Sequence, residues 1–137
     1  FSGDGAFGIA VNELTAIGRE EWPAVTQIVF RNYQCGAEKR NSTLLYDDNF
    51  VGTELDTQVS YAGIAKACGL QGVVAKTMDE LTEALHTAIK DQMENGKTTL
   101  IEAMINQELG EPFRRDAMKK PVAVAGVSAS DMREQVV

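Results

Sequence analysis

Cysteine is scarce in this sequence of 137 residues, and its scarcity argues against a disulfide scaffold and a cysteine-based zinc site. The two cysteines, Cys35 and Cys68, are too few for a disulfide scaffold and too far apart for a cysteine-based zinc site. No apolar run approaches the roughly 20 residues that a membrane-spanning helix needs. No basic segment followed by an apolar one opens the chain. We therefore expect a cytoplasmic protein that binds no membrane.

Positive charge is also in short supply, with 13 basic residues against 20 acidic ones and a net charge of −7. An acidic chain is repelled by the phosphates of nucleic acids, so a nucleic-acid partner is not expected. Hydrophobic residues make up 44% of the sequence, which in a chain of this length is enough for one core. The totals therefore predict a single globular unit.

Apolar periodicity predicts helices that alternate with strands. Ser60 and Thr77 are expected to cap helices, Thr77 forms a capping box with Glu80, and Gly69 and Gly96 follow the helix ends. A strand–helix alternation favours an α/β fold of three layers, in which a mainly parallel sheet has helices on both faces. Helices are expected over 7–17, 60–68 and 77–95, and strands over 25–30, 72–75 and 98–105. A long loop with a short turn of helix is expected over 33–57. The helix over 77–95 has an apolar stripe at Leu81, Leu85, Ala88, Ile89 and Met93.

The triplet Gly3-Asp4-Gly5 directly precedes the first expected helix. Ligands bind outside the carboxyl ends of strands in an open parallel sheet, and small residues before a helix N-terminus let the backbone approach a phosphate. Such triplets are more often ordinary turns. Here, however, a helix, a strand and Asn32 follow in the order that a binding site requires.

The carboxylate of Asp4 would be repelled by a phosphate beside it unless a cation lies between the two groups. Mg²⁺ commonly uses one or two carboxylates together with substrate phosphates. The strand over 25–30 brings the residues that follow it to the same edge of the sheet, where Asn32 offers an amide oxygen and Gln34 a backbone carbonyl. We therefore predict the metal ligands Asp4, Asn32 and Gln34, and the cofactor-binding residues Gly3, Asp4, Gly5, Ala6, Asn32, Gln34 and Gly36.

Gly3-Asp4-Gly5, 26 intervening residues and then Asn32 resemble the diphosphate-binding motif of the thiamine-diphosphate-dependent enzymes of the acetolactate synthase and pyruvate decarboxylase group. The resemblance implies that Mg²⁺ is bound by Asp4, Asn32 and the carbonyl of Gln34. The family usually has two consecutive asparagines, whereas this chain has Arg31-Asn32. It also implies that residues 1–121 form the diphosphate-binding domain, incomplete at its N-terminus, and that residues 122–137 form a C-terminal tail.

Within this group the chain is most similar to the sulfoacetaldehyde acetyltransferases, although Cys35 stands where an aromatic residue is expected. The resemblance implies that the cofactor's ylid attacks sulfoacetaldehyde, that sulfite leaves, and that the acetyl group passes to inorganic phosphate. It also implies that the glutamate activating the cofactor lies in a missing N-terminal domain, usually of a neighbouring subunit, in a homodimer or homotetramer. The stretches that carry this similarity are residues 34–39, 50–51, 54–56, 96–99 and 108–117.

Two adjacent cations, Arg114 and Arg115, are a candidate site for a substrate anion, since guanidinium groups suit sulfonate and phosphate oxygens.

Alternative functions from other classes stay open at this point. The chain fits a decarboxylase or an acetolactate synthase-like member of the same family, and it also fits a non-catalytic scaffold fragment that keeps the fold without binding cofactor.

Overall fold

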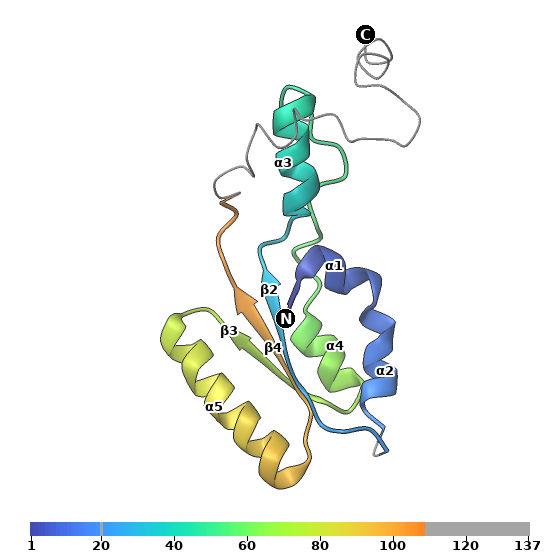
Figure 1. Ribbon diagram of the computed structural model, residues 1–137, viewed down its shortest axis with the longest axis vertical. Helices are drawn as coiled ribbons and strands as arrows, with labels where there is room; N and C mark the ends of the chain where they lie inside the picture. Colours follow the sequence, from blue (N-terminus) through green and yellow to red (C-terminus); the bar gives the residue numbers. More distant parts are fainter. Residues whose placement is uncertain (20, 109–137) are drawn as a thin grey trace, which may run out of the picture.

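A four-stranded parallel sheet forms the centre of the computed structural model, which describes residues 1–19 and 21–108 (Figure 1). The strand order is β1-β2-β4-β3. The strands are β1 (Ser2–Gly3), β2 (Thr26–Arg31), β3 (Gln71–Ala75) and β4 (Thr99–Met104). Because every pairing is parallel, the carboxyl ends of all four strands lie at one edge of the sheet.

The helices cover both faces of the sheet, as the sequence predicted (Figure 1). On one face lie α1 (Asp4–Ile9), α2 (Leu14–Ile17) and α4 (Tyr61–Ala67), and on the other lies α5 (Met78–Asn95). Val29 and Leu100 face the first group, and Ile28 and Ile101 face α5. A fifth helix, α3 (Gly36–Leu45), follows β2 beyond the sheet.

Central strand β4 is buried along almost its whole length, from Thr99 to Ala103. Its neighbours pair with it in register, Thr26 of β2 and Gln71 of β3 both lying opposite Thr99. A strand buried on both faces is expected to be apolar throughout. Glu102 in this strand is therefore an exception that needs a partner.

The first and third predicted segments differ from the structure. The helix expected over 7–17 begins three residues earlier, at Asp4, and is divided into α1, a 3₁₀ turn (Val11–Glu13) and α2. The loop expected over 33–57 contains the ten-residue helix α3. This helix has almost no apolar stripe, because its residues are mostly polar, so periodicity alone did not indicate it.

The remaining predicted helices and strands are confirmed to within one or two residues. Ser60 caps α4 by accepting from the Gly63 N–H at 3.1 Å, and Thr77 caps α5 by accepting from the Glu80 N–H at 3.2 Å. The Glu80 carboxylate, however, accepts from the Lys76 N–H at 2.6 Å, one residue before the cap. Gly96 ends α5 with φ of 60°.

The predicted apolar stripe of α5 is only partly correct. The buried side chains are Ala84 and Ala88, with Leu81 and Leu85 packed against them. Ile89 and Met93 are 51% and 78% exposed. The buried face follows positions i, i+3, i+4 and i+7 from Leu81, which places Ile89 and Met93 on the flank of the helix.

Glycine at position 72 is required by the close packing of β3 against α4. A Cβ added to Gly72 would lie 2.1 Å from the carbonyl oxygen of Ala62, whereas one added to Gly63 would meet nothing closer than 3.5 Å. We expect Gly72→Ala to lower the free energy of unfolding by at least about 2 kcal/mol through overpacking. The control Gly63→Ala, in a helix, should be neutral or stabilising by up to about 1 kcal/mol. Urea unfolding checks both, and equal midpoints for the two variants would contradict the packing argument.

Candidate functional site

The predicted site lies where the carboxyl ends of β1, β2 and β4 meet. A cavity of about 370 Å³ opens there, within the range of small-molecule sites. All seven predicted cofactor-binding residues line it: Gly3, Asp4, Gly5, Ala6, Asn32, Gln34 and Gly36. Its other lining residues are Ile9, Phe30, Cys35, Ala37, Glu38 and Ile105. The topology thus brings together two segments that are far apart in the sequence.

The Asp4 carboxylate is buried, with 2% of the residue exposed, and its two oxygens have different surroundings. Oδ2 accepts from the backbone N–H groups of Asn32 at 3.1 Å and Tyr33 at 2.7 Å, and from Arg31 Nη1 at 3.4 Å. Oδ1 accepts from the Gly5 N–H at 3.0 Å. Oδ2 is therefore saturated with donors, whereas Oδ1 keeps a free lone pair.

The side-chain oxygen of Asn32 faces two other oxygens. It lies 3.1 Å from the Gln34 carbonyl oxygen and 3.2 Å from Asp4 Oδ1, while its amide nitrogen faces Gln34 Nε2 at 3.3 Å. Rotated by 180°, the same amide would donate to both oxygens and accept from Gln34. In the first orientation the oxygen also accepts from the Gln34 N–H at 3.3 Å, and a cation among the three oxygens would offset their mutual repulsion. The second orientation satisfies the amide without a cation. The amide can therefore serve either state of the site.

Tyr33 shapes the turn that brings Gln34 next to Asn32. Its φ of 60° lies in the left-handed region, which a non-glycine residue rarely adopts, so the turn is strained. The Leu55 N–H donates to the Tyr33 carbonyl at 2.8 Å, and the Gln34 side chain donates to the Gln107 carbonyl at 2.9 Å. These contacts hold the turn from outside the cavity.

A buried ion cluster supports the site, and no local pattern in the sequence indicated it. Arg31 is 1% exposed and lies between two carboxylates, with Nη1 3.4 Å from Asp4 Oδ2 and Nε 3.3 Å from Glu102 Oε1. Its Nη2 donates to the carbonyls of Asp56 at 2.8 Å and Val59 at 2.9 Å. Arg31 thus joins β2 to the chain before α4.

Tyr61 contacts the cluster from α4. Its hydroxyl donates to the Asp4 carbonyl at 3.1 Å, and its ring centroid lies 4.8 Å from Arg31 Cζ. The pKa of Tyr61 is raised above its ordinary value, chiefly by burial, so the hydroxyl stays protonated and able to donate at neutral pH.

Cys35 is a packed thiol at the cavity wall. A Cβ added to Gly5 would lie 3.1 Å from Cys35 Sγ, so glycine there allows α1 to approach the turn after β2. Burial raises the pKa of the Cys35 thiol, and the charges of Glu38 and Asp4 raise it further. A raised pKa means less thiolate at neutral pH, which disfavours nucleophilic catalysis by this residue.

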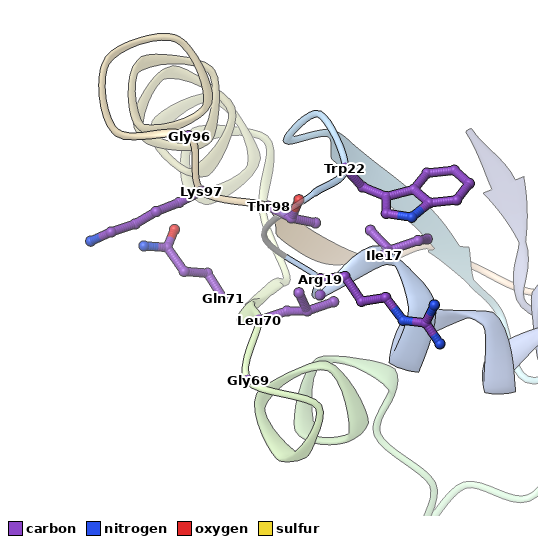
Figure 2. Close-up of a pocket in the computed structure, with 10 residues that line it drawn as sticks. Ile17, Arg19, Trp22, Gly69, Leu70, Gln71, Gly96, Lys97 and Thr98 are labelled. Carbon is purple, nitrogen blue, oxygen red and sulfur yellow. The ribbon is translucent and has the colours of Figure 1, made fainter.

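A second cavity, of about 510 Å³, lies at the opposite edge of the sheet, by the amino ends of the strands (Figure 2). Trp22 lies beside Ile17 at its rim, while Arg19 and Lys97 point away from each other. Two cations that diverge do not form an anion site. The cavity is also distant from the strand ends at which ligands bind in such sheets.

The candidate anion site and the expected tail fall outside the part of the chain that the structure describes. Arg114, Arg115 and residues 122–137 all follow residue 108. Among residues 1–19 and 21–108, no cluster of three or more His, Cys, Asp or Glu side chains could hold a metal. None of the helices described is both long and apolar enough to cross a membrane.

A parallel sheet with helices on both faces and a cavity at the carboxyl ends of its strands defines a cofactor-binding α/β domain. The chain belongs to the family of the thiamine pyrophosphate enzyme C-terminal TPP-binding domain, whose model matches residues 1–103. The family assignment and the α/β fold predicted from the sequence are therefore confirmed.

Individual proteins are also similar to this chain over most or all of its length. The chain is 85% identical over its whole length to a sulfoacetaldehyde acetyltransferase of Roseovarius nubinhibens, and 78% identical over 98% of its length to one of Rhodobacter capsulatus. It spans 23% of the length of each. The crystal structure of benzoylformate decarboxylase from Polynucleobacter necessarius matches 81% of this chain, and 20% of its own, with a TM-score of 0.68 and 27% identity.

The buried position of Arg31 generates a prediction about stability. Arg31→Met leaves Asp4 and Glu102 as buried carboxylates without their shared cation, and we expect a loss of about 3–5 kcal/mol in the free energy of unfolding. The control Lys90→Met removes the cation of an exposed pair with Glu94 at 4.0 Å and should change it by less than about 1 kcal/mol. Chemical unfolding measures both, and a loss at Arg31 no larger than at Lys90 would refute the role of the cluster.

Proposed function

We propose that this chain is the C-terminal cofactor-binding part of a thiamine-diphosphate-dependent acyltransferase that converts sulfoacetaldehyde and phosphate into acetyl phosphate and sulfite. The family supports the cofactor, since its model describes a TPP-binding domain. The two acetyltransferase relatives, at 85% and 78% identity, support the reaction. The structural likeness to benzoylformate decarboxylase, at 27% identity, is weaker support for a decarboxylase.

We further propose that Mg²⁺ links the protein to the cofactor's diphosphate through Asp4 Oδ1, the Asn32 side-chain oxygen and the Gln34 carbonyl. The spacing of the groups carries this proposal, because the inner end of the Asn32 amide lies 3.1 Å from the Gln34 carbonyl oxygen and 3.2 Å from Asp4 Oδ1. In an octahedron with metal–oxygen distances of about 2.1 Å, adjacent oxygens lie about 3.0 Å apart. The spacing thus fits two edges of a magnesium octahedron.

The chemistry of these donors also fits Mg²⁺. All three are hard oxygen ligands, and only one carries a charge, which leaves positions for diphosphate oxygens and water. Because Asp4 Oδ2 is occupied by three donors, the carboxylate offers a single oxygen. One-oxygen coordination suits the small Mg²⁺ ion better than Ca²⁺, which often takes both oxygens of a carboxylate.

The residues of this chain bind and orient the cofactor, and thiamine diphosphate when bound supplies the carbanion chemistry. The backbone at Gly3 borders open space, since an added Cβ would meet nothing within 4 Å, and this leaves room for the diphosphate beside the first turn of α1. At the rim of the cavity, Ile9 and Ile105 are 86% and 48% exposed and offer apolar surface to the organic part of the cofactor.

The carboxylate that activates the cofactor's aminopyrimidine is proposed to come from the N-terminal part of the enzyme, in a homodimer or homotetramer of the cytoplasm. Among the described residues that line the cavity, only Asp4 and Glu38 carry a carboxylate. Asp4 is engaged by its backbone donors, and Glu38 lies exposed in the first turn of α3. Neither is placed for that role.

Binding of the cofactor should depend on the metal. When thiamine diphosphate is titrated into the full-length enzyme that contains this chain, we expect binding heat with Mg²⁺ and at least about 100-fold weaker binding with excess chelator, since the diphosphate then faces Asp4 without a cation. Asp4→Ala should abolish the Mg²⁺-dependent heat, and the control Glu83→Ala, on the exposed face of α5, should leave it unchanged. Equal binding with and without Mg²⁺ would contradict the metal site, and no binding at all would favour a scaffold.

Turnover should require the rest of the enzyme. The full-length enzyme is expected to release sulfite from sulfoacetaldehyde and to form acetyl phosphate only when phosphate is present, whereas the isolated 137-residue chain should be inert because it lacks the activating carboxylate. A sulfite assay with pyruvate and benzoylformate as competing substrates distinguishes the acyltransferase from a synthase or a decarboxylase. Turnover by the isolated chain, or preference for either competitor, would count against the proposal.

A further inference from the structure

Glu102 is a buried carboxylate that the proposed function does not use. It lies in the central strand β4, is 3% exposed, and does not line the cavity. Oε2 accepts from the Ser60 hydroxyl at 2.9 Å and the Ala62 N–H at 3.1 Å, and Oε1 lies 3.3 Å from Arg31 Nε. A charged group in the middle of a buried strand is costly, so its partners indicate its role.

The charges of Asp4, Arg31 and Glu102 follow one another in a row. The Arg31 guanidinium lies between the two carboxylates, at 3.4 Å from Asp4 and 3.3 Å from Glu102. The rings of Tyr33 and Tyr61 lie 4.2 and 4.8 Å from its Cζ. These contacts exclude water, and electrostatic interactions are much stronger in such an interior than in solvent.

Arg31 therefore has two opposite effects on the proposed metal ligand. It binds the carbonyls of Asp56 and Val59 and contacts Asp4 Oδ2, which stabilises the walls of the site. Its positive charge also reduces the attraction of the Asp4 carboxylate for a cation. An arginine without a countercharge would stabilise the structure of the site and lower its affinity for a cation.

We propose that Glu102 is a positioning residue that acts through Arg31, by supplying the countercharge that lets Arg31 stay beside Asp4 without weakening cation binding. The inference rests on the proposed function, because it assumes the Mg²⁺ site at Asp4. It assigns Glu102 an electrostatic effect on a ligand that it does not touch.

The test measures the apparent dissociation constant of Mg²⁺ by calorimetry at pH 8, in full-length enzyme with the same fixed excess of thiamine diphosphate for every variant. Glu102→Gln leaves the Arg31 charge unbalanced and should raise this constant by about tenfold or more. The double variant Arg31→Gln/Glu102→Gln removes both charges and should return it to within about threefold of the wild-type value. The two backbone donors still hold Asp4 Oδ2 in this variant.

A matched control separates charge from packing. Thr99 lies at the other end of the same strand, is 2% exposed, and donates to Gln71 Oε1 at 2.8 Å. Thr99→Val should lower the melting temperature and leave the Mg²⁺ constant unchanged. An unchanged constant in Glu102→Gln, or a double variant as weak as Glu102→Gln, would overturn the inference, because an effect of the unbalanced Arg31 charge must disappear when that charge is also removed.

A further comparison keeps the test valid if Glu102→Gln fails to fold. Arg31→Gln keeps the negative charge of Glu102, so it should bind Mg²⁺ at least threefold more tightly than the double variant. Equal constants would refute the electrostatic role. A wild-type enzyme without Mg²⁺-dependent binding would instead refute the proposed function, so the two failures are distinguishable.

Discussion

The carboxylate of Asp4 is the interaction on which the site depends. Its Oδ2 accepts from backbone groups that follow β2, while its own backbone begins α1 after β1. One side chain thus joins the ends of two neighbouring strands and stabilises the shape of the cavity between them. The same bonds leave Oδ1 facing the Asn32 side chain, so the residue that supports the structure is also the proposed metal ligand.

The site combines rigid backbone with a balanced set of charges. The strained turn at Tyr33 brings a carbonyl next to an amide, and such strain is typical of functional sites. Beneath the turn, one guanidinium is shared by two carboxylates, each held by further hydrogen bonds. The larger cavity at the other edge of the sheet has neither feature, which is why its volume alone does not indicate a function.

The sequence predicted the parts of the molecule that depend on local patterns. Strand ends, helix caps and the motif around Asp4 and Asn32 can be read from a few neighbouring residues, and the family confirms the fold that they imply. The helix α3 was missed because its polar sequence has no apolar periodicity. The partnership of Arg31 with Glu102 could not be predicted either, because the two are distant in sequence and meet only through the pairing of β2 with β4.

The pairing of Arg31 with Glu102 also restricts how this domain can evolve. A neutral residue at position 31 would leave the acid in β4 without a cation, and a neutral residue in β4 would leave a buried cation unbalanced. The two positions are therefore expected to change together, through intermediates that are less stable than either end state. Natural variants that keep only one of the two charges should be rare, and an arginine at position 31 should accompany an acid in the central strand.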